Sequence, residues 1–418
     1  MPKTRSGPLL VAAPAFVLIA ASFAASAQQP DRPLGLPPVP VPADNPQTPE
    51  KVKLGEKLFN DKRFSLTGEV SCSNCHDPNK AFTDSPLTTS EGINKLKGTR
   101  NAPTVVNAAY FASQFWDGRA QTLEDQALLP ITNPVEMGLP NHDPVLEIVR
   151  TDPEYVAAFE QVFGKKGEEV TMREVTQAIA AFERTLIAGD SPFDRWYFGG
   201  DKSAMSEAAI RGFDVFLNKG RCVSCHTIEQ DHALFTDNRF HNIGVGINRI
   251  QKDIPKLAPA FLKARSQGVD VDEKVLTDPR VSELGRFAIT TSLDDLGAFK
   301  TSTLRNVAVT PPYMHDGSLK TLREVVEHYN NGGVSNPDDP VNDFLSGGIR
   351  PLNLTEQEIN DLVAFLESLT SPRFAALQAQ RMAMNPQACL VKPSRTTTAA
   401  AGAATAAGPA AATEGATP

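Results

Sequence analysis

The pentads CSNCH at residues 72–76 and CVSCH at residues 222–226 decide the fold of this chain. Each pentad follows a similar apolar helix start, GEKLF at residues 55–59 and GFDVF at residues 212–216. A unit that recurs with the same order of features predicts two similar domains. We place the boundary between them near Gly199-Gly200, because paired glycines favour a linker.

The spacing within each pentad has a chemical reason. Two thiols three positions apart can add to the two vinyl groups of one haem, and the next histidine then lies under the iron as its fifth ligand. The sequence therefore predicts two covalently attached c-type haems, the first held by Cys72, Cys75 and His76, and the second held by Cys222, Cys225 and His226.

Two other chemistries use paired cysteines. A thioredoxin-like redox pair needs a βαβ setting, which the sequence does not show. A four-cysteine zinc site does not require a histidine directly after each second cysteine. Cys389 is left over and is interpreted as an unpaired thiol.

The composition is that of a globular, helical protein. Of 418 residues, 41% are hydrophobic and only 7% are aromatic, which excludes a wholly disordered chain and a membrane bundle. With 41 Lys and Arg against 49 Asp and Glu, the net charge is −8, and we expect no nucleic-acid partner.

Apolar residues at helical spacing mark four clear helices, and no strand pattern stands out. Thr171 and Thr355 are expected N-caps, the latter with Glu358 in a capping box. We expect an all-α protein of two domains with long loops, and we interpret the charged, Pro-containing stretch 250–282 as a variable surface loop. The four expected helices are 172–187, 208–217, 322–329 and 356–369.

The N-terminus has the pattern of a secretory signal. Lys3 and Arg5 precede an apolar run, and Ala25-Ser26-Ala27 is an A-x-A cleavage site. The alternative, a membrane anchor, requires a longer apolar run without proline. We expect cleavage after Ala27, export to the periplasm and no membrane span.

The predicted organisation follows from these features. The expected segments are a signal peptide (1–27), a Pro-rich extended lead-in (28–48), an N-terminal haem domain (49–200), a C-terminal haem domain (201–372) and a C-terminal tail (373–418) that is disordered from about residue 395.

The first haem is expected to have an open face. No histidine occurs between His76 and His142, and no methionine occurs between His76 and Met137. An open haem binds and splits a peroxide, whereas a closed one only passes electrons.

Five further motifs carry a resemblance to a known family. Over residues 50–370 the sequence resembles the bacterial dihaem cytochrome c peroxidases and their MauG-type relatives. The resemblance implies two cytochrome-c-like helical domains, with a calcium ion and a tryptophan between two haems. The motifs are RNAPT (100–104), FWDGR (115–119), NPVEM (133–137), TLRN (303–306) and PYMHDG (312–317).

The resemblance also implies roles for individual residues. Trp116 would connect the two haems electronically, although an ordinary core tryptophan is the alternative. Glu136 matches the family's distal acid–base residue, with a solvated helix-end carboxylate as the alternative. Gln126 and Pro130 match distal-pocket positions of the MauG-type branch. Oxygen ligands suit a hard cation, and those implied for calcium are the Asn101 side chain and the backbone carbonyls of Thr310 and Pro312.

Physical chemistry supports the role of Glu136. Splitting a peroxide bond moves a proton from the near oxygen to the leaving oxygen, and a carboxylate above the iron can carry it. Gln126 could orient the peroxide by a hydrogen bond. Arg119 and Arg305 are candidates either for haem propionates or for surface ion pairs.

The sequence departs from the family pattern at two places, and each departure predicts a ligand arrangement at one of the two haems. The stretch 81–99 lacks the histidine that closes the resting first haem in many family members, so we expect this haem to be open without prior reduction. The usual methionine ligand of the second haem is replaced by Tyr329, as in the MauG-type branch. Met314, His241 and His328 are the other candidates, but His328 and Tyr329 point about 100° apart on a helix and cannot both face one iron.

Three functions remain open. A phenolate ligand favours ferric iron, so the second haem is expected to have a low potential. The leading hypothesis is reduction of hydrogen peroxide to water with electrons from a small cytochrome or cupredoxin. The second is MauG-like oxidation of a partner protein, and the third is a non-catalytic dihaem electron carrier. A homodimer is left open.

Overall fold

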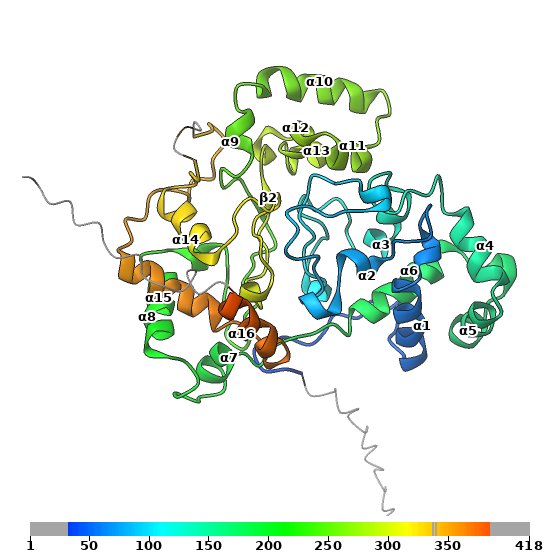
Figure 1. The fold of residues 1–418 in the computed structure, drawn as a ribbon, viewed down its shortest axis with the longest axis horizontal. Coiled ribbons are helices and arrows are strands. Elements are labelled where there is room, and N and C mark those ends of the chain that lie inside the picture. The colour runs from blue at the N-terminus through cyan, green and yellow to red at the C-terminus, as the bar shows by residue number, and fades with distance from the viewer. Residues whose placement is uncertain (1–31, 337, 339–340, 385–418) are drawn as a thin grey trace, which may run out of the picture. The chain divides into compact units, whose positions relative to one another are not determined.

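The computed structural model describes residues 32–336, 338 and 341–384, and this part of the chain is mostly helical (Figure 1). Its two strands, β1 (Phe240–His241) and β2 (Phe299–Lys300), have two residues each and pair antiparallel. No helix among these residues combines the length and the hydropathy needed to cross a membrane. The expectation of a helical protein is confirmed.

The first half of the chain is built around the contact between α1 (Pro49–Phe59) and α6 (Met172–Glu183). Thr171 caps α6 through a capping box with Glu174, which confirms the expected start of this helix. The apolar side chains of both helices join one core with those of α3 (Leu123–Thr132), α4 (Asp143–Thr151) and α5 (Pro153–Phe163).

The second half repeats this arrangement. Its central contact joins α8 (Glu207–Leu217) to α15 (Glu356–Glu367), with α14 (Leu322–Asn330) packed on α15. Thr355 and Glu358 form the expected capping box. The aromatic residues Phe213, Phe216 and Phe365 fill the core of this half, and Phe193 of α7 (Pro192–Tyr197) packs among them.

A glycine in each repeated helix explains the sequence repeat physically. A Cβ atom on Gly55 would lie 1.8 Å from the backbone oxygen of Ala178 in α6, and one on Gly212 would lie 1.8 Å from that of Asp361 in α15. Only glycine permits such a close helix crossing. The repeat therefore encodes the same helix crossing ahead of each CxxCH pentad.

The interpretation of residues 250–282 as a surface loop is wrong. These residues form helices with a buried cluster that includes Ile250, Ile254, Ala258 and Phe261. Lysines and prolines between the apolar residues obscured the helical spacing of three and four in the sequence. The helices, grouped together at the top of Figure 1, are α9 (Ile247–Ile250), α10 (Ile254–Ser266), α11 (Val271–Thr277), α12 (Pro279–Ser282) and α13 (Phe287–Thr290).

Both ends of the described chain join the core. Within the expected lead-in, Leu36 is fully buried and Asn45 donates a hydrogen bond to Glu124 of α3. The expected tail begins with η9 (Pro372–Phe374) and α16 (Ala375–Met384). The expected signal peptide, the expected unpaired thiol Cys389 and the expected disorder from about residue 395 lie outside the described residues.

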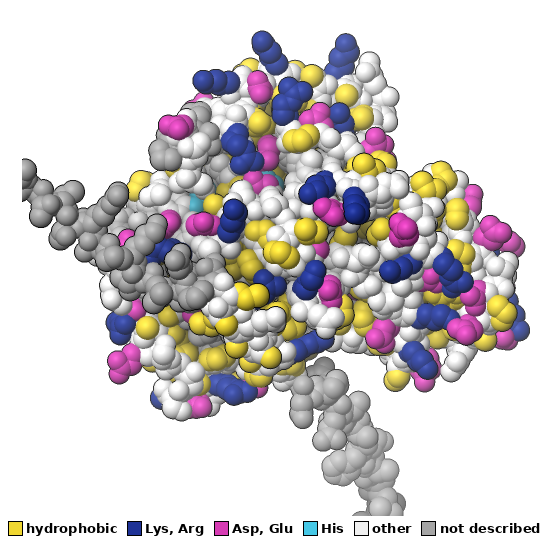
Figure 2. Space-filling view, in the orientation of Figure 1, with side chains coloured by type: hydrophobic (Ala, Val, Ile, Leu, Met, Phe, Trp, Pro, Cys, Tyr) yellow, Lys and Arg dark blue, Asp and Glu magenta, His cyan; other side chains and the backbone are white. Residues whose placement is uncertain are grey.

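Acidic and basic side chains are interspersed over the face shown in Figure 2.

Short helices make up the rest of the regular secondary structure. The remaining short elements are α2 (Cys72–Cys75), η1 (Lys62–Phe64), η2 (Pro78–Lys80), η3 (Ile93–Lys95), η4 (Ala108–Tyr110), η5 (Gly167–Glu169), η6 (Cys222–Ser224), η7 (Leu293–Asp295) and η8 (Val307–Val309).

Candidate functional site

Each pentad lines a cavity of its own. Cys72, Cys75 and His76 lie in the wall of a cavity of about 130 Å³, which we call the Cys72 cavity. Cys222, Cys225 and His226 lie in the wall of a second cavity of about 670 Å³, the Cys222 cavity. Because the two cysteine pairs lie in different cavities, they cannot form one four-cysteine zinc site.

The four pentad cysteines, Cys72, Cys75, Cys222 and Cys225, form no disulfide with one another. Burial, with smaller contributions from Glu183 and the neighbouring thiol, raises the pKa of Cys72 to about 12. Burial and the nearby Glu136 do the same for Cys75, and burial raises the pKa of Cys222 to about 12. A thioredoxin-like redox pair needs a lowered thiol pKa, so this environment argues against it.

The pentad histidines are oriented in the same way in both cavities. Nδ1 of His226 lies 2.8 Å from the backbone oxygen of Phe235, and Nδ1 of His76 lies 3.2 Å from that of Phe82. A carbonyl oxygen only accepts, so Nδ1 is the donor and Nε2 keeps its lone pair. Burial also lowers the pKa of both imidazoles. A neutral imidazole whose Nδ1 is held by a backbone carbonyl is the form that binds iron through Nε2.

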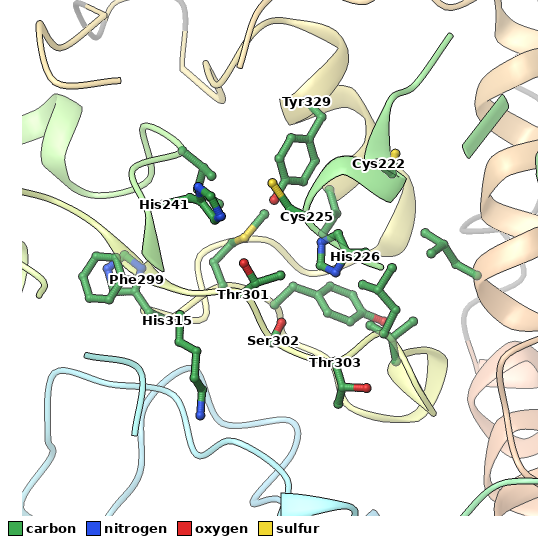
Figure 3. A pocket seen from close by; sticks show the side chains of 18 of the residues that line it. Cys222, Cys225, His226, His241, Phe299, Thr301, Ser302, Thr303, His315 and Tyr329 are labelled. Carbon is green, nitrogen blue, oxygen red and sulfur yellow. The ribbon is translucent and has the colours of Figure 1, made fainter. Parts of the chain in front are cut away.

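Tyr329 lies in the wall of the Cys222 cavity, near Cys225 and His226 (Figure 3). Burial raises the pKa of its phenol. The neighbouring His328 points elsewhere: its Nδ1 lies 2.6 Å from Ser335 Oγ and its Nε2 lies 2.9 Å from the backbone oxygen of Ile243. Both imidazole nitrogens of His328 therefore have protein partners, and His328 is not among the residues that line this cavity.

The other candidates for this position remain in the wall. Met314 and His241 also line the Cys222 cavity. Nε2 of His241 lies 2.8 Å from Asp237 Oδ2, and this contact holds the imidazole in place. His241 was expected to be hydrogen-bonded, and it is.

Glu136 is a buried carboxyl group in the wall of the Cys72 cavity. Its Oε2 atom has no hydrogen-bond partner. Burial and the charge of Asp272 raise its pKa to about 7, against the opposing effect of Arg119. This combination excludes the solvated helix-end alternative and leaves a group that exchanges protons near neutral pH.

Gln126 and Pro130 line the same cavity from α3. They are four residues apart, so they lie on one face of the helix. Pro130 sits inside α3 and leaves one backbone carbonyl without its helical donor. Met137, next to Glu136, also lines this wall. Among the described residues that line the Cys72 cavity, His76 is the only histidine.

Trp116 lines both cavities. Its Nε1 donates a hydrogen bond of 2.9 Å to the backbone oxygen of Asn101, which also lines both. The Asn101 amide donates to the backbone oxygens of Leu87 and Thr88, which leaves Oδ1 available as an oxygen ligand. Thr310 and Pro312 line the Cys222 cavity together with Asn101.

The two arginines form buried rather than surface ion pairs, and each lines a cavity: Arg305 the Cys222 cavity and Arg119 the Cys72 cavity. Arg305 is buried and forms a bidentate ion pair with Asp194, with further hydrogen bonds to the backbone oxygens of Gly35 and Ala233. Arg119 is buried between Asp117 and Asp272. The Arg305–Asp194 and Arg119–Asp272 ion pairs each join residues that are distant in sequence.

Sequence reasoning missed two residues in the wall of the Cys72 cavity, Glu183 and Leu276, and also Asp272, which binds the wall residue Arg119. Glu183 ends α6, which begins where predicted but stops short of the expected end at residue 187. Nothing in the spacing of Glu183 indicates that it points inwards. Leu276 and Asp272 belong to α11, within the stretch that was interpreted as a surface loop.

The comparisons with known proteins identify the family. A family profile described as "Di-haem cytochrome c peroxidase" matches residues 49–203. "Methylamine utilization protein MauG" of Methylorubrum extorquens is 40% identical over 331 residues, covering 79% of this chain and 81% of that protein. "Cytochrome-c peroxidase IdrP1" of Denitromonas iodatirespirans is 39% identical over 376 residues, covering 88% of this chain and 94% of that protein.

Solved structures agree with these relatives. The crystal structure of a MauG-like protein associated with microbial copper homeostasis is similar, with a TM-score of 0.65 and 34% identity over 82% of this chain and 98% of that chain. The chain belongs to the di-haem cytochrome c peroxidase family. It is an oxidoreductase of the peroxidase type, and its family implies two haem cofactors.

Proposed function

We propose that the protein reduces hydrogen peroxide to water at a haem in the Cys72 cavity. Cys72 and Cys75 would hold this haem by thioether bonds, with His76 as the iron ligand. Cys222, Cys225 and His226 would hold a second haem in the Cys222 cavity. The neutral thiols and the carbonyl-held imidazoles support this assignment.

A haem iron with one open face binds and activates peroxide, and a haem iron with two protein ligands transfers electrons. The overall reaction consumes one hydrogen peroxide, two electrons and two protons and gives two waters. The residues of the chain must therefore supply protons on one side and an electron path on the other.

The observation that carries the proposal is the Oε2 atom of Glu136, which is buried in the wall of the Cys72 cavity without a partner. Its pKa of about 7 makes both the carboxylate and the acid available near neutral pH. Glu136 would take the proton from one peroxide oxygen and give it to the leaving oxygen. Gln126 would orient the peroxide from the neighbouring helix.

Electrons would reach this cavity through Trp116, which lines both cavities. Tyr329 would be the second iron ligand in the Cys222 cavity, since His328 faces away from it. A calcium ion held by Asn101 Oδ1 and the carbonyls of Thr310 and Pro312 would fix the backbone to which Trp116 is hydrogen-bonded.

The wider organisation belongs to the same proposal. Two cytochrome-c-like domains, 49–200 and 201–372, would each carry one haem. Helix α7 precedes the boundary between them but packs on the second domain. The chain would be exported to the periplasm after cleavage at Ala27. The electrons would come from a small redox protein, a cytochrome c or a cupredoxin.

Tyr329 also favours a second candidate function. An anionic oxygen ligand stabilises the oxidised forms of a haem. With such a ligand, oxidising equivalents from peroxide would be held long enough to oxidise side chains of a partner protein, as in a MauG-like enzyme. The relative "Methylamine utilization protein MauG" is consistent with this candidate.

Stopped-flow spectroscopy with peroxide tests the proposal and separates the two candidates. The purified dihaem protein is mixed with peroxide, with and without a reduced small cytochrome c. Rapid oxidation of the cytochrome at two equivalents per peroxide supports peroxide reduction. A long-lived oxidised species that does not oxidise the reduced cytochrome supports the MauG-like candidate. A protein that leaves peroxide unconsumed contradicts both.

A further inference from the structure

Helix α11 (Val271–Thr277) reaches the Cys72 cavity from the second half of the sequence. Leu276 lies in the cavity wall, and Val275 accepts a hydrogen bond of 2.7 Å from Thr99 through its backbone oxygen. One turn earlier, Asp272 reaches residues that surround Glu136. The helix is therefore part of the site.

The Asp272 carboxylate accepts two hydrogen bonds, one from a charged side chain and one from a neutral side chain. Arg119 donates through Nε to Asp272 Oδ1 at 2.6 Å, and Asn133 donates through Nδ2 to Asp272 Oδ2 at 2.7 Å. Both carboxylate oxygens are therefore committed. The Asp272 side chain is 14% exposed, so this ion pair is only weakly screened by solvent.

The Arg119 guanidinium is held on several sides. Its Nη1 atom lies 3.1 Å from Asp117 Oδ1, its Nε is bound to Asp272, and it stacks on the Phe115 ring at 3.5 Å. The Arg119 side chain is 6% exposed and the Asp117 side chain is fully buried. Arg119 is close enough to Glu136 to lower its pKa, yet the two form no ion pair.

The other charged groups near Glu136 are few. Cys72 and Cys75 interact with it electrostatically, but both become uncharged thioethers when haem is attached. The loop that binds the Glu136 backbone carries Glu91 and Lys97, which pair with each other at 3.1 Å at the surface. Arg100 and Glu183 also line this cavity, but Asp272 and Arg119 are the two charged groups that act on the pKa of Glu136.

We propose that Asp272 is a positioning residue for peroxide reduction: it holds Arg119 away from Glu136, so that the Glu136 carboxyl stays without an ion-pair partner and can exchange protons with peroxide. The inference rests on the proposed function of the Cys72 cavity. Without Asp272, the guanidinium keeps the Phe115 ring and only one of its two carboxylate partners, Asp117, so its charge acts on Glu136 with less compensation. Glu136 would then remain a carboxylate at lower pH.

The test is the pH profile of the peroxide reaction in the Asp272→Asn variant, measured by stopped flow on the dihaem protein. If the Glu136 carboxylate is the reactive form, the wild-type rate constant rises with pH through about 7. Loss of the Asp272 charge should move this rise about one pH unit lower. On the plateau above both midpoints, the variant should react several-fold more slowly, because a carboxylate of lower pKa takes up the peroxide proton less readily.

Infrared spectroscopy gives a second readout that does not depend on turnover. The carboxyl C=O band of Glu136, identified by its absence in Glu136→Gln, is titrated in the resting protein. Its midpoint should fall in Asp272→Asn and stay unchanged in the control Glu273→Gln. Glu273 is on the same helix and exposed, so its variant also removes one negative charge from α11.

The outcomes separate the two claims. An unchanged band midpoint and an unchanged profile in Asp272→Asn contradict the role of Asp272, even if Glu136→Gln is slow. A normal peroxide rate in Glu136→Gln contradicts the proposed function of Glu136, whatever Asp272 does. If Asp272→Asn does not fold, Asp272→Ser tests the same charge, and Asp272→Glu should restore the wild-type midpoint.

Discussion

The indole Nε1 of Trp116 donates a hydrogen bond of 2.9 Å to the backbone oxygen of Asn101, and both residues lie in the walls of both cavities. A single contact thus connects the residue proposed to carry electrons with the residue proposed to bind calcium. A substitution at one of these two residues should therefore alter the function of the other.

Replacement of Trp116 by Phe should slow electron transfer between the two haems. Phe keeps an apolar ring in the shared wall but removes the indole and its hydrogen bond to Asn101. We expect the second haem to be reoxidised more slowly after peroxide is added to the half-reduced protein. The control is Trp196→Phe, a tryptophan that lines neither cavity. Equal rates in the wild type and both variants would remove Trp116 from the path.

Removal of calcium should uncouple the two haems without releasing them. Without the ion, the Asn101 segment loses an anchor, and Trp116 loses its fixed acceptor. Chelation should slow electron transfer between the haems, and added Ca²⁺ should restore it. Asn101→Ala should show the slow behaviour without chelator. A metal analysis that finds no bound calcium in the active protein would contradict the calcium proposal.

Replacement of Glu136 by Gln should lower the rate constant for peroxide by about 10²–10⁴-fold. The amide keeps the shape of the side chain but cannot carry the proton. The measurement is the stopped-flow reaction of the resting protein with peroxide at neutral pH. Glu91→Gln is a suitable control, because Glu91 pairs with Lys97 at the surface. An unchanged rate would rule out Glu136 as the proton carrier.

Replacement of Tyr329 by Met should raise the reduction potential of the second haem, because a thioether ligand favours ferrous iron. Spectroelectrochemical titration measures the potential, and low-temperature electron paramagnetic resonance reports the ligand set. Tyr197→Phe is the control, since Tyr197 is 44% exposed on α7. If the Tyr329 variant keeps the wild-type spectrum, Met314 or His241 becomes the better ligand candidate.

Glu183 should make stability depend on pH. Burial and the nearby Glu124 raise its pKa to about 8, against the effect of Arg184. In the unfolded chain the group has an ordinary pKa and releases its proton earlier. The contribution of Glu183 is therefore complete at acidic pH and is lost as pH rises towards about 8.

Chemical denaturation at several pH values measures this effect. The free energy of unfolding should fall by up to about 1.4 kcal/mol per pH unit between the two pKa values. Glu183→Gln cannot titrate, so its stability should depend less on pH by that amount. Parallel curves for the wild type and the variant would contradict a raised pKa at Glu183.

Local patterns gave a large part of the fold. Helices α6 and α15 could be predicted because their apolar spacing and their capping threonines lie within a dozen residues. The two pentads and the 100° angle between His328 and Tyr329 are equally local properties. Each of these predictions depends on residues that are close in sequence.

Long-range contacts could not be predicted in this way. Asp272 meets Arg119 only because the stretch 250–282 folds into helices, and its charged surface concealed the apolar residues that face inwards. The settings of Arg119 and Arg305 depend on acids far away along the chain. The resemblance to a family named most of the candidate site, whereas Asp272 and Glu183 required the structure.

The backbone oxygen of Gly35 accepts a hydrogen bond from the Arg305 guanidinium, and Asp194 completes its ion pair. Both partners precede the second pentad, whereas Arg305 follows it. A fragment that starts at residue 201 would therefore bury a cation without its counter-charge, which is strongly destabilising. Separate expression of the second haem unit should fail unless residues 33–200 are supplied as a complementing fragment.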